Sequence, residues 1–307
     1  MRRRDFLGAA SVVALSSQVA VAQPVPLSSG SESPALHAPP GTTDCHHYIY
    51  NPRYPVVSRY ISHPKEADPD DYRGLMRRLG ITRHVVIQPS TYGTDNRAML
   101  DALKTFGAEA RGVAVVAASV SDTELKRLNE LGVRGLRVNF APAGPMTPAM
   151  IEPLARRIEP LGWHIEINAW ARDLAAMAPF LERLPTPVTL DHFAHIPEPE
   201  GASDTLFAQV LRLVDKGKTW VKLAAPYDAS KVGPPGYADS SALARAYVKA
   251  APERLIWGTN WPHPGENLRP DDAQIFDLLS DWAPDAATRN RILVGNPAIL
   301  YGFPAIA

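Results

Sequence analysis

The stretch from Val133 to Asn168, VRGLRVNFAPAGPMTPAMIEPLARRIEPLGWHIEIN, decides the fold of this protein. It begins with a short β-like run, continues with apolar residues spaced three and four apart, and ends with a second β-like run. Gly162 follows the middle segment, and glycine commonly ends an α-helix. A strand, a helix and a strand in this order are typical of two parallel strands joined by a helical crossover.

The same alternation extends in both directions from this unit. Eight β-like runs follow one another, at residues 43–50, 83–90, 111–119, 133–140, 163–170, 186–193, 219–226 and 254–261. Helical patterns that end in glycine lie between them, for example at residues 69–80, 96–107, 121–132 and 147–162. Eight strands alternating with helices predict an α/β protein with a single-domain (β/α)8 TIM barrel at residues 42–307.

An open, doubly wound sheet is the alternative arrangement of these elements. Such a sheet usually has a glycine-rich phosphate-binding loop after its first strand. The corresponding residues here, 50–53, read YNPR and contain no glycine. The barrel is therefore favoured, and a barrel carries its functional residues at the carboxyl ends of the strands.

The composition is that of a globular protein without a nucleic-acid partner. Of 307 residues, 45% are hydrophobic, and 32 Lys and Arg balance 32 Asp and Glu, so no basic field would attract nucleic acid. Cys45 is the one cysteine and cannot form an intramolecular disulfide. We expect it to be a small buried residue in the barrel wall.

The first 41 residues differ from the rest of the chain. Residues 1–22 contain arginines, an apolar segment and the small residues AVA, which is the order of a cleavable export signal. RRDFL at residues 3–7 resembles the twin-arginine type, so we expect export by that machinery and a periplasmic or secreted protein. The apolar segment is shorter than the about 20 residues of a membrane span, so none is expected in the mature form. Residues 23–41 are rich in Pro, Ser and Gly and are predicted to be a linker.

The first β-like run contains the adjacent histidines His46 and His47. Adjacent strand residues point to opposite faces, so the two cannot face one pocket together. Asp44 and Tyr48 share the parity of His46. The position at which a second histidine would pair with His46 is therefore held by Tyr48.

Polar residues gather at the ends of the predicted strands. Arg137 and Lys222 lie within apolar strand patterns, where an ionised side chain needs a partner or a ligand. Histidines at several such positions favour a site over isolated core histidines; they are His46, His164, His192, His195 and His263. The further polar residues are Asp44, Tyr48, Gln88, Ser90, Tyr92, Asn139, Glu166, Asn168, Asp191, Tyr227, Asp228 and Asn260.

These segments resemble the strand ends of amidohydrolase-related barrels (amidohydrolase family 2). The first run resembles the family pattern Asp-x-His-x-His-Ile-Tyr, and VVIQPSTYGTDN, GLRVNF, GWHIEIN, LDHFAHIP, WVKLAAPYD and LIWGTNWPHP follow in family order. They look like the strand ends of the branch that contains 2-pyrone-4,6-dicarboxylate lactonases and sugar-lactone enzymes. The resemblance runs from about Gly41 to the C-terminus, and it implies a barrel that hydrolyses the ester bond of a lactone.

The chain departs from the family pattern at residues that would bind metal. Tyr48 replaces the second histidine of the first strand, Asn168 stands in place of a histidine, and Asn260 replaces the usual aspartate. A tight divalent site needs several imidazole and carboxylate ligands. We therefore expect no tightly bound metal, and if a weakly bound zinc is present we expect His46 and His192 to hold it. Twin-arginine cargo often carries a cofactor, which points the other way.

The resemblance also implies roles. The family aspartate would activate water, which Asn260 cannot do, so His192 is the first candidate for the general base. Asp228, at a position where relatives tend to have arginine, and Glu166 are alternative bases, and Asp44 is a candidate for orienting His46 or His192. The predicted catalytic residues are therefore His46, His192, Asn260 and Asp228.

Arg137 is the expected clamp for an anionic group, since its charge is permanent and its donors are fork-shaped. Tyr92 and Tyr227 are expected to close the pocket, and Asp228 argues against a second substrate carboxylate. The predicted substrate-binding residues are Ser90, Tyr92, Arg137, Asn139, His164, Asn168, His195, Lys222, Tyr227 and His263.

The sequence thus predicts an exported hydrolase that opens a lactone, or a similar cyclic ester, of a small carboxylate. One alternative is an isomerase of sugar lactones, or a metal-dependent hydrolase or decarboxylase of the same barrel type. A second is a small-molecule-binding pseudoenzyme, which the loss of a carboxylate at Asn260 would permit.

Overall fold

The computed structural model describes residues 24–57, 63–140, 147–267 and 269–306, so the predicted export signal at 1–22 lies outside the described residues. The strands are β1 (Thr43–His47), β2 (Arg83–Ile87), β3 (Ala110–Ala114), β4 (Val133–Asn139), β5 (His164–Asn168), β6 (Val188–Leu190), β7 (Thr219–Ala224) and β8 (Leu255–Gly258). The α-helices are α1 (Pro69–Leu79), α2 (Arg97–Phe106), α3 (Asp122–Glu130), α4 (Pro148–Ile158), α5 (Ala171–Leu181), α6 (Thr205–Asp215), α7 (Ala238–Ala250), α8 (Asp272–Trp282), α9 (Ala286–Asn290) and α10 (Asn296–Tyr301).

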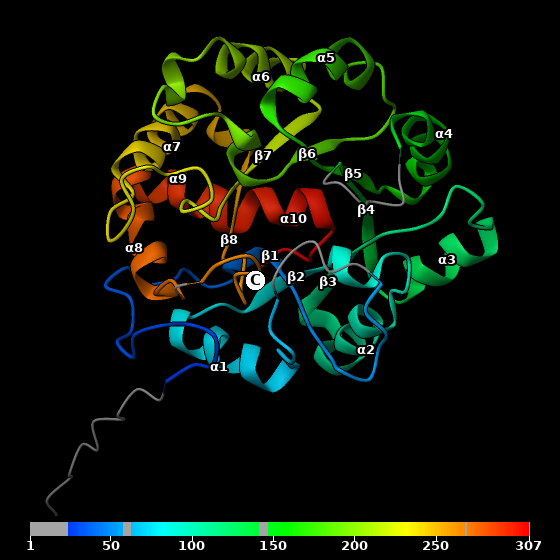
Figure 1. The fold of residues 1–307 in the computed structure, drawn as a ribbon, viewed down its shortest axis with the longest axis horizontal. Helices are drawn as coiled ribbons and strands as arrows, with labels where there is room; N and C mark the ends of the chain where they lie inside the picture. The colour runs from blue at the N-terminus through cyan, green and yellow to red at the C-terminus, as the bar shows by residue number, and fades with distance from the viewer. Residues whose placement is uncertain (1–23, 58–62, 141–146, 268, 307) are drawn as a thin grey trace, which may run out of the picture.

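The eight strands form one parallel sheet in the order β1 to β8, with the helices around it (Figure 1). This confirms the predicted (β/α)8 barrel.

The local sequence also specifies where individual helices begin and end, and α1 is an example. Asp68 caps its first N–H groups, Pro69 occupies its first position, and Gly80 ends it with a left-handed φ of 74°.

Backbone hydrogen bonds close the sheet between its first and last strands. The N–H of Asn260 donates to the carbonyl of His46 at 2.7 Å, and the N–H of Tyr48 donates to the carbonyl of Trp261 at 2.8 Å. The Asp44 carboxylate adds to this closure, because it accepts from the backbone N–H of Thr259 at 3.0 Å and from its hydroxyl at 2.6 Å. His46, Tyr48 and Asn260 are thereby held at one rim of the barrel.

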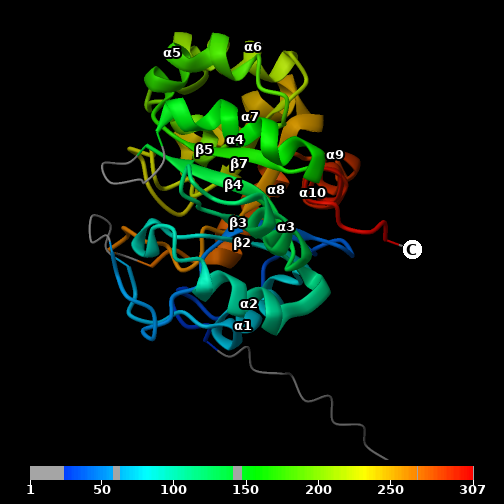
Figure 2. The ribbon, with the colours of Figure 1, turned by 90° about the vertical axis from the view of Figure 1, so that its right-hand side faces the viewer.

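The C-terminal helices cover the opposite end of the barrel. Figure 2 shows α9 and α10 together at one end of the molecule. The Tyr301 ring packs edge-on against His164 at the start of β5, with 5.2 Å between ring centres. Arg111 of β3 donates to the carbonyl of Gly302 at 3.3 Å. The amino ends of the strands are therefore filled by protein, which leaves the carboxyl ends for a ligand.

The segment predicted to be a linker lies against the barrel. Residues 24–41 contain no helix or strand, yet Arg78 of α1 donates to the carbonyl of Glu32 at 2.8 Å. Asp277 of α8 accepts from the backbone N–H of Leu36 at 2.8 Å. The segment is thus fixed to two outer helices. Among the described residues, no helix has the length and apolar character that crossing a membrane requires.

Candidate active site

A pocket of about 220 Å³ opens at the carboxyl ends of the strands. Eight of the predicted site residues line it: Ser90, Arg137, Asn139, Asn168, His192, His195, Asp228 and Asn260. Its other lining residues are Tyr48, Tyr50, Pro89, Thr91, Phe140, Ala169, Trp170 and Pro264. The aromatic and proline residues of this second set follow strands in loops, where no sequence pattern marked them as part of a site. Tyr48 is different, because its parity with His46 predicted that it shares the same face.

The other predicted site residues do not line the pocket. His46 and Lys222 are fully buried in the barrel interior. Tyr227 is hydrogen-bonded to His263 and to the pocket-lining residue Asn260. The Tyr92 hydroxyl bonds to the backbone of Asn51 at 2.9 and 3.0 Å instead of facing the pocket.

His164 lies farthest from its predicted role. It begins β5, next to Tyr301 at the amino end of the barrel, and is fully buried. A Cβ added at Gly135 would come within 2.5 Å of its ring, so glycine at that position makes room for the imidazole. His164 therefore packs at the amino end of the barrel and does not contact the pocket.

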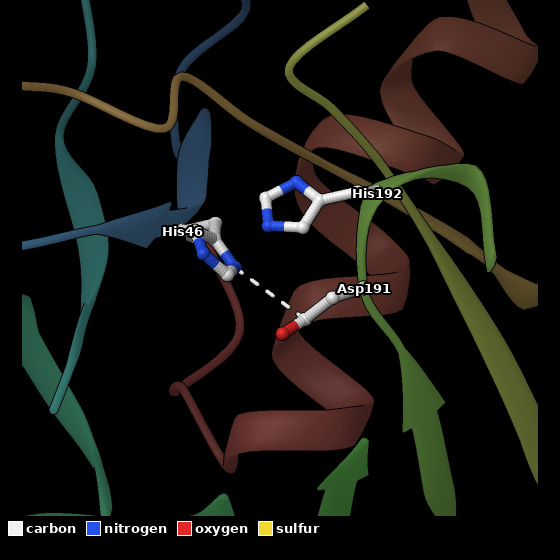
Figure 3. A group of neighbouring side chains, drawn as sticks. All are labelled: His46, Asp191 and His192. Carbon is white, nitrogen blue, oxygen red and sulfur yellow. Dashed lines mark ion pairs between the residues drawn. The ribbon is translucent and has the colours of Figure 1, made fainter. Parts of the chain in front are cut away.

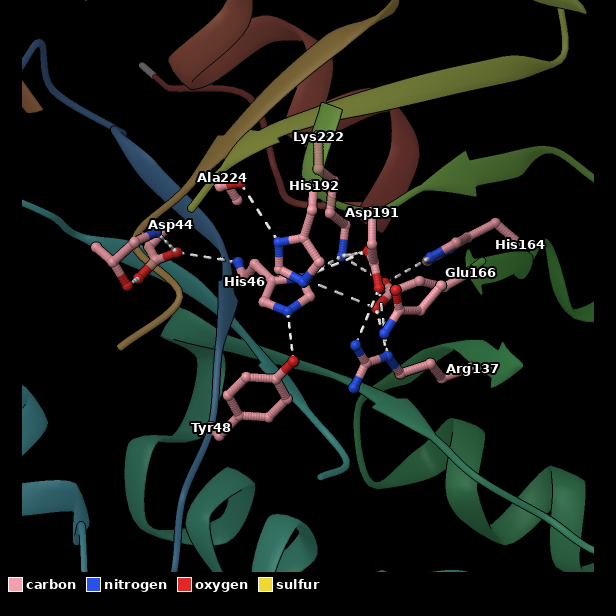
Figure 4. Close-up of polar contacts among 12 residues, drawn as sticks. Asp44, His46, Tyr48, Arg137, His164, Glu166, Asp191, His192, Lys222 and Ala224 are labelled. Carbon is pink, nitrogen blue, oxygen red and sulfur yellow. Dashed lines mark hydrogen bonds and ion pairs between the residues drawn. The ribbon is translucent and has the colours of Figure 1, made fainter. Parts of the chain in front are cut away.

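A cluster of buried charged groups lies in the barrel interior, next to the pocket-lining residues Arg137 and His192 (Figure 4). The Lys222 ammonium lies 2.5 Å from a Glu166 oxygen, 3.2 Å from Nδ1 of His46 and 3.4 Å from an Asp191 oxygen. Arg137 lies 3.1 Å from Asp191 and 3.5 Å from Glu166. Two cations therefore balance two carboxylates, and this pairing offsets the desolvation of all four.

This cluster changes two sequence predictions. Arg137 has no acidic neighbour in sequence, but Asp191 and Glu166 pair with it across the barrel, so it is not a free cation. Glu166 is fully buried and directed at Lys222, so it does not offer a base to the pocket.

The charged cluster also controls protonation. Burial lowers the pKa of His46 to about 3, and the charge of Lys222 acts in the same direction, so the imidazole is neutral at pH 7. Burial by itself would raise the pKa of Asp191, but Lys222, His46 and Arg137 outweigh it and hold that pKa well below its usual range.

Asp44 does not orient the ring of either candidate histidine. Its carboxylate accepts from the Tyr72 hydroxyl at 2.8 Å and from the backbone N–H of His46 at 2.9 Å, in addition to Thr259. Burial raises its pKa to about 6, although these hydrogen bonds act against the shift. Asp44 is therefore a residue of the barrel closure.

His192 is presented by a strained turn after β6. Residues 192–195 all have positive φ, between 48° and 58°, although none of them is glycine. Such backbone is costly for L-residues and is typical of functional sites. The Nδ1 atom of His192 lies 3.4 Å from the carbonyl oxygen of Ala224, which favours the tautomer with Nδ1 protonated and Nε2 available as an acceptor. Burial lowers the pKa of His192, so the ring is neutral at pH 7.

A hydrogen-bonded chain fixes the Asn260 amide. Asp272 lies 3.1 Å from Nε2 of His263, and Nδ1 of His263 lies 2.8 Å from the Tyr227 hydroxyl. In the tautomer whose Nε2–H donates to Asp272, Nδ1 of His263 accepts from the Tyr227 hydroxyl, and the Tyr227 oxygen accepts from Nδ2 of Asn260 at 2.9 Å. The Oδ1 atom of Asn260 is buried and has no hydrogen-bond partner among the described residues.

The mouth of the pocket holds a second, smaller network. Nε2 of His195 lies 2.6 Å from Oδ1 of Asn168, and Nδ1 lies 3.2 Å from the Asp228 carboxylate. Burial acts to raise the pKa of Asp228, but its hydrogen bond with His195 and the charge interactions with His192 and His195 together outweigh burial, so the pKa is lowered. Trp170 is 61% exposed and packs on His195, with 5.1 Å between ring centres. Asp228 is thus engaged with His195, which makes it a weak candidate for the base.

A candidate metal triad is present within the charged cluster. His46, Asp191 and His192 place one ligand atom each within 4.8 Å of the others (Figure 3). However, Nδ1 of His46 is engaged by Lys222 and Nε2 lies 2.7 Å from the Tyr48 hydroxyl. A divalent ion bound by this triad would lie beside the Lys222 ammonium, which already occupies the cation position next to Asp191. The ligand atoms of His46, Asp191 and His192 therefore suit the Lys222 ammonium better than a metal ion.

The chain matches known proteins over most of its length. The amidohydrolase family model matches residues 43–303. A 2-pyrone-4,6-dicarboxylate hydrolase of Comamonas testosteroni is 36% identical over 87% of this chain and 92% of its own length. A D-galactarolactone isomerase of Agrobacterium fabrum is 31% identical over 90% and 95%, and a 4-sulfomuconolactone hydrolase of Hydrogenophaga intermedia is 32% identical over 86% and 89%.

A solved structure shares the fold closely. A protein of Agrobacterium tumefaciens, crystallised without ligand, superposes with a TM-score of 0.84 at 29% identity, over 91% of this chain and 99% of that one. These comparisons confirm the family that the sequence motifs resemble.

Proposed function

Because this chain belongs to the amidohydrolase family, we propose that it is a hydrolase that opens the ring of a small lactone carrying a carboxylate. Two of its relatives are described as hydrolases, one of 2-pyrone-4,6-dicarboxylate and one of 4-sulfomuconolactone. The pocket has a volume of about 220 Å³, which suits a small lactone that carries a carboxylate. It also contains the groups that ester hydrolysis requires: a base, a cation and hydrogen-bond donors.

The observation that carries this proposal is that His192 and Asn260 line one pocket and that Oδ1 of Asn260 has no hydrogen-bond partner among the described residues. A water molecule that donates one hydrogen to each of them has a lone pair left for attack on the ester carbonyl. His192 takes the proton from water as the new bond forms and returns it to the ring oxygen, which leaves as an alcohol or enol when its bond to the carbonyl carbon breaks. Asn260 thereby keeps the positioning part of the family aspartate's role while His192 supplies the basicity.

Arg137 is the cation that attracts the substrate carboxylate. It lines the pocket although it is only 3% exposed, and its charge is shared with Asp191 and Glu166. A partly neutralised guanidinium holds an anion by directed N–H donors more than by net charge. We therefore expect one carboxylate at this position.

Isomerisation of a lactone is the second candidate function, because a D-galactarolactone isomerase is similar to this chain over 95% of its length. The two functions differ in whether a water molecule is consumed. Hydrolysis adds a water molecule to the substrate, whereas isomerisation leaves its composition unchanged.

The direct test is a panel of carboxylate-bearing lactones, followed by acid release and by mass spectrometry, with and without a strong chelator. We expect ring opening that survives chelation, because Lys222 and Arg137 supply the positive charge beside Asp191. Elemental analysis of the purified protein is the control. About one tightly bound divalent ion per chain, together with activity lost on chelation, would contradict the metal-independent form of the proposal.

We also propose that the protein acts in the periplasm or outside the cell. The support is the sequence alone: paired arginines at positions 3 and 4, an apolar segment and small residues before position 23. The test is fractionation of cells that make the wild type or the double variant Arg3→Lys, Arg4→Lys. Export of the wild type and retention of the variant are expected, and equal retention of both would contradict the proposal.

A further inference from the structure

Tyr48 lies at the end of a chain of hydrogen bonds that begins at a buried cation. We propose that Tyr48 donates a hydrogen bond to the carbonyl oxygen of the substrate ester, and that Lys222 and His46 are positioning residues that direct its proton into the pocket. This inference rests on the proposed ester hydrolysis. It adds a group that stabilises the developing oxyanion to the base and water already described.

The direction of the chain is set by Lys222. An ammonium group has three N–H donors and no acceptor. The three acceptors around Nζ are Glu166 at 2.5 Å, Nδ1 of His46 at 3.2 Å and Asp191 at 3.4 Å. Nδ1 of His46 also lies 3.5 Å from an Asp191 oxygen, but its contact with Lys222 is shorter. Since Lys222 only donates, we assign Nδ1 of His46 as the acceptor of that hydrogen bond.

The second step follows from the protonation of His46. A ring nitrogen that accepts a hydrogen bond carries no proton, so a ring whose Nδ1 accepts from Lys222 has its proton on Nε2. Nε2 lies 2.7 Å from the Tyr48 oxygen, so His46 donates and Tyr48 accepts.

The third step leaves the Tyr48 proton without a partner in the charged cluster. Its oxygen accepts from His46 and also interacts with the Arg137 guanidinium, which likewise only donates. Both flanking groups are donors, so the O–H bond must point away from them. Tyr48 lines the pocket, and that is where its hydrogen is directed. Burial raises the pKa of Tyr48 above its usual range, so the hydroxyl keeps its proton at working pH.

A donor fixed in this way suits ester hydrolysis. The carbonyl oxygen gains negative charge as water attacks, and a preorganised donor binds it more strongly in the transition state than in the ground state. Removing one such donor typically costs about 10²- to 10³-fold in kcat. The phenol of Tyr48 is held by neighbours that cannot accept its proton, so little reorganisation is needed.

The first experiment reads the hydrogen-bond direction without turnover. In protein labelled with ¹⁵N-histidine, long-range ¹H–¹⁵N spectra show which nitrogen of each neutral ring is protonated. The His46 signals are identified as those that change most in Tyr48→Phe. We expect Nε2 protonated and Nδ1 unprotonated in the wild type. Protonation of Nδ1 would overturn the proposed chain whether or not the protein hydrolyses lactones.

The second experiment measures the catalytic effect. Tyr48→Phe keeps the ring and removes the donor, so kcat on the lactone found with the panel is expected to fall about 10²- to 10³-fold while KM changes less than about threefold. Tyr72→Phe is the matched control, because it removes a fully buried tyrosine hydroxyl that contacts Asp44 and does not line the pocket. Wild-type kcat in Tyr48→Phe would overturn the role of Tyr48 and leave the proposed hydrolysis intact. A wild type that opens no lactone would contradict the proposed function itself.

Discussion

The Nζ atom of Lys222 lies 3.2 Å from Nδ1 of His46, although β7 and β1, which carry them, are not neighbours in the sheet. The contact is possible because both side chains point into the barrel interior. It places the Lys222 amino group within reach of the first-strand histidine and of the carboxylates of Glu166 and Asp191. The barrel thus holds its internal charge balance with its own side chains, and this balance sets the protonation of the groups near the pocket.

His192→Asn is expected to lower kcat by about 10²-fold or more, because it removes the general base. Asparagine accepts the left-handed backbone at this position, where φ is 50°, so the turn is preserved. The pH profile of the wild type gives a second check. A base is active when unprotonated, so activity falls as the pH drops through its pKa, and burial places that pKa below 6.5. A wild-type acid limb centred above 6.5, or unchanged in the variant, would assign the base to another group.

Asn260→Asp is expected to lower kcat/KM roughly 10- to 100-fold instead of restoring a family-like base. The Tyr227 proton is already directed at His263, so a carboxylate at position 260 would face an oxygen without a donor. In the wild type, Nδ2 of Asn260 is directed at Tyr227, and the buried Oδ1 has no partner among the described residues. Kinetics of the variant with a melting curve as control decide the point, and a large gain in kcat/KM would show that the chain had only lost its base.

Arg137→Lys is expected to raise KM for an anionic lactone about tenfold, because lysine keeps the charge and loses the planar fork. Nε and Nη2 of Arg137 both contact Asp191, at 3.3 and 3.1 Å, and a single ammonium cannot reproduce this pair of contacts. Thermal unfolding measured alongside separates binding from stability. Wild-type KM on an active anionic substrate would show that Arg137 is only a partner of the buried carboxylates.

Asp44→Asn is expected to reduce the free energy of unfolding by about 2–4 kcal/mol, because the carboxylate accepts hydrogen bonds from Thr259, Tyr72 and the His46 backbone and an amide cannot accept them all. The melting temperature would fall by several degrees while KM of the remaining folded enzyme stays near the wild-type value. Denaturant titration measures the loss. An unchanged midpoint would mean that the closure of β1 onto β8 does not depend on Asp44.

The sequence predicted the features that depend on periodicity. Alternating runs gave the barrel, and the parity of His46 and Tyr48 placed both on one face while His47 stacks on Tyr72 outside it, 3.6 Å between ring centres. Contacts between distant segments were not predictable. Nothing near Arg137 in sequence indicates its pairing with Asp191.

The direction of hydrogen bonds was also beyond the sequence. The sequence identified Asn260 as a departure from the family, but the orientation of its amide depends on Asp272 and His263 through Tyr227. His164 shows the opposite error. His164 is a histidine in a predicted strand, but it lies at the end of the barrel away from the pocket. Its position along the barrel axis depends on the register of the whole sheet, which the sequence of one strand does not show.

The central claim, that this protein adds water to a lactone ring, is tested most directly by turnover in ¹⁸O-labelled water. The lactone found with the panel is incubated with the enzyme in labelled water, and the product is examined by mass spectrometry after correction for spontaneous opening. Attack of water held by His192 and Asn260 on the ester carbonyl predicts one ¹⁸O atom in the new carboxylate of each product molecule. A product of unchanged composition that carries no label would contradict hydrolysis and establish isomerisation.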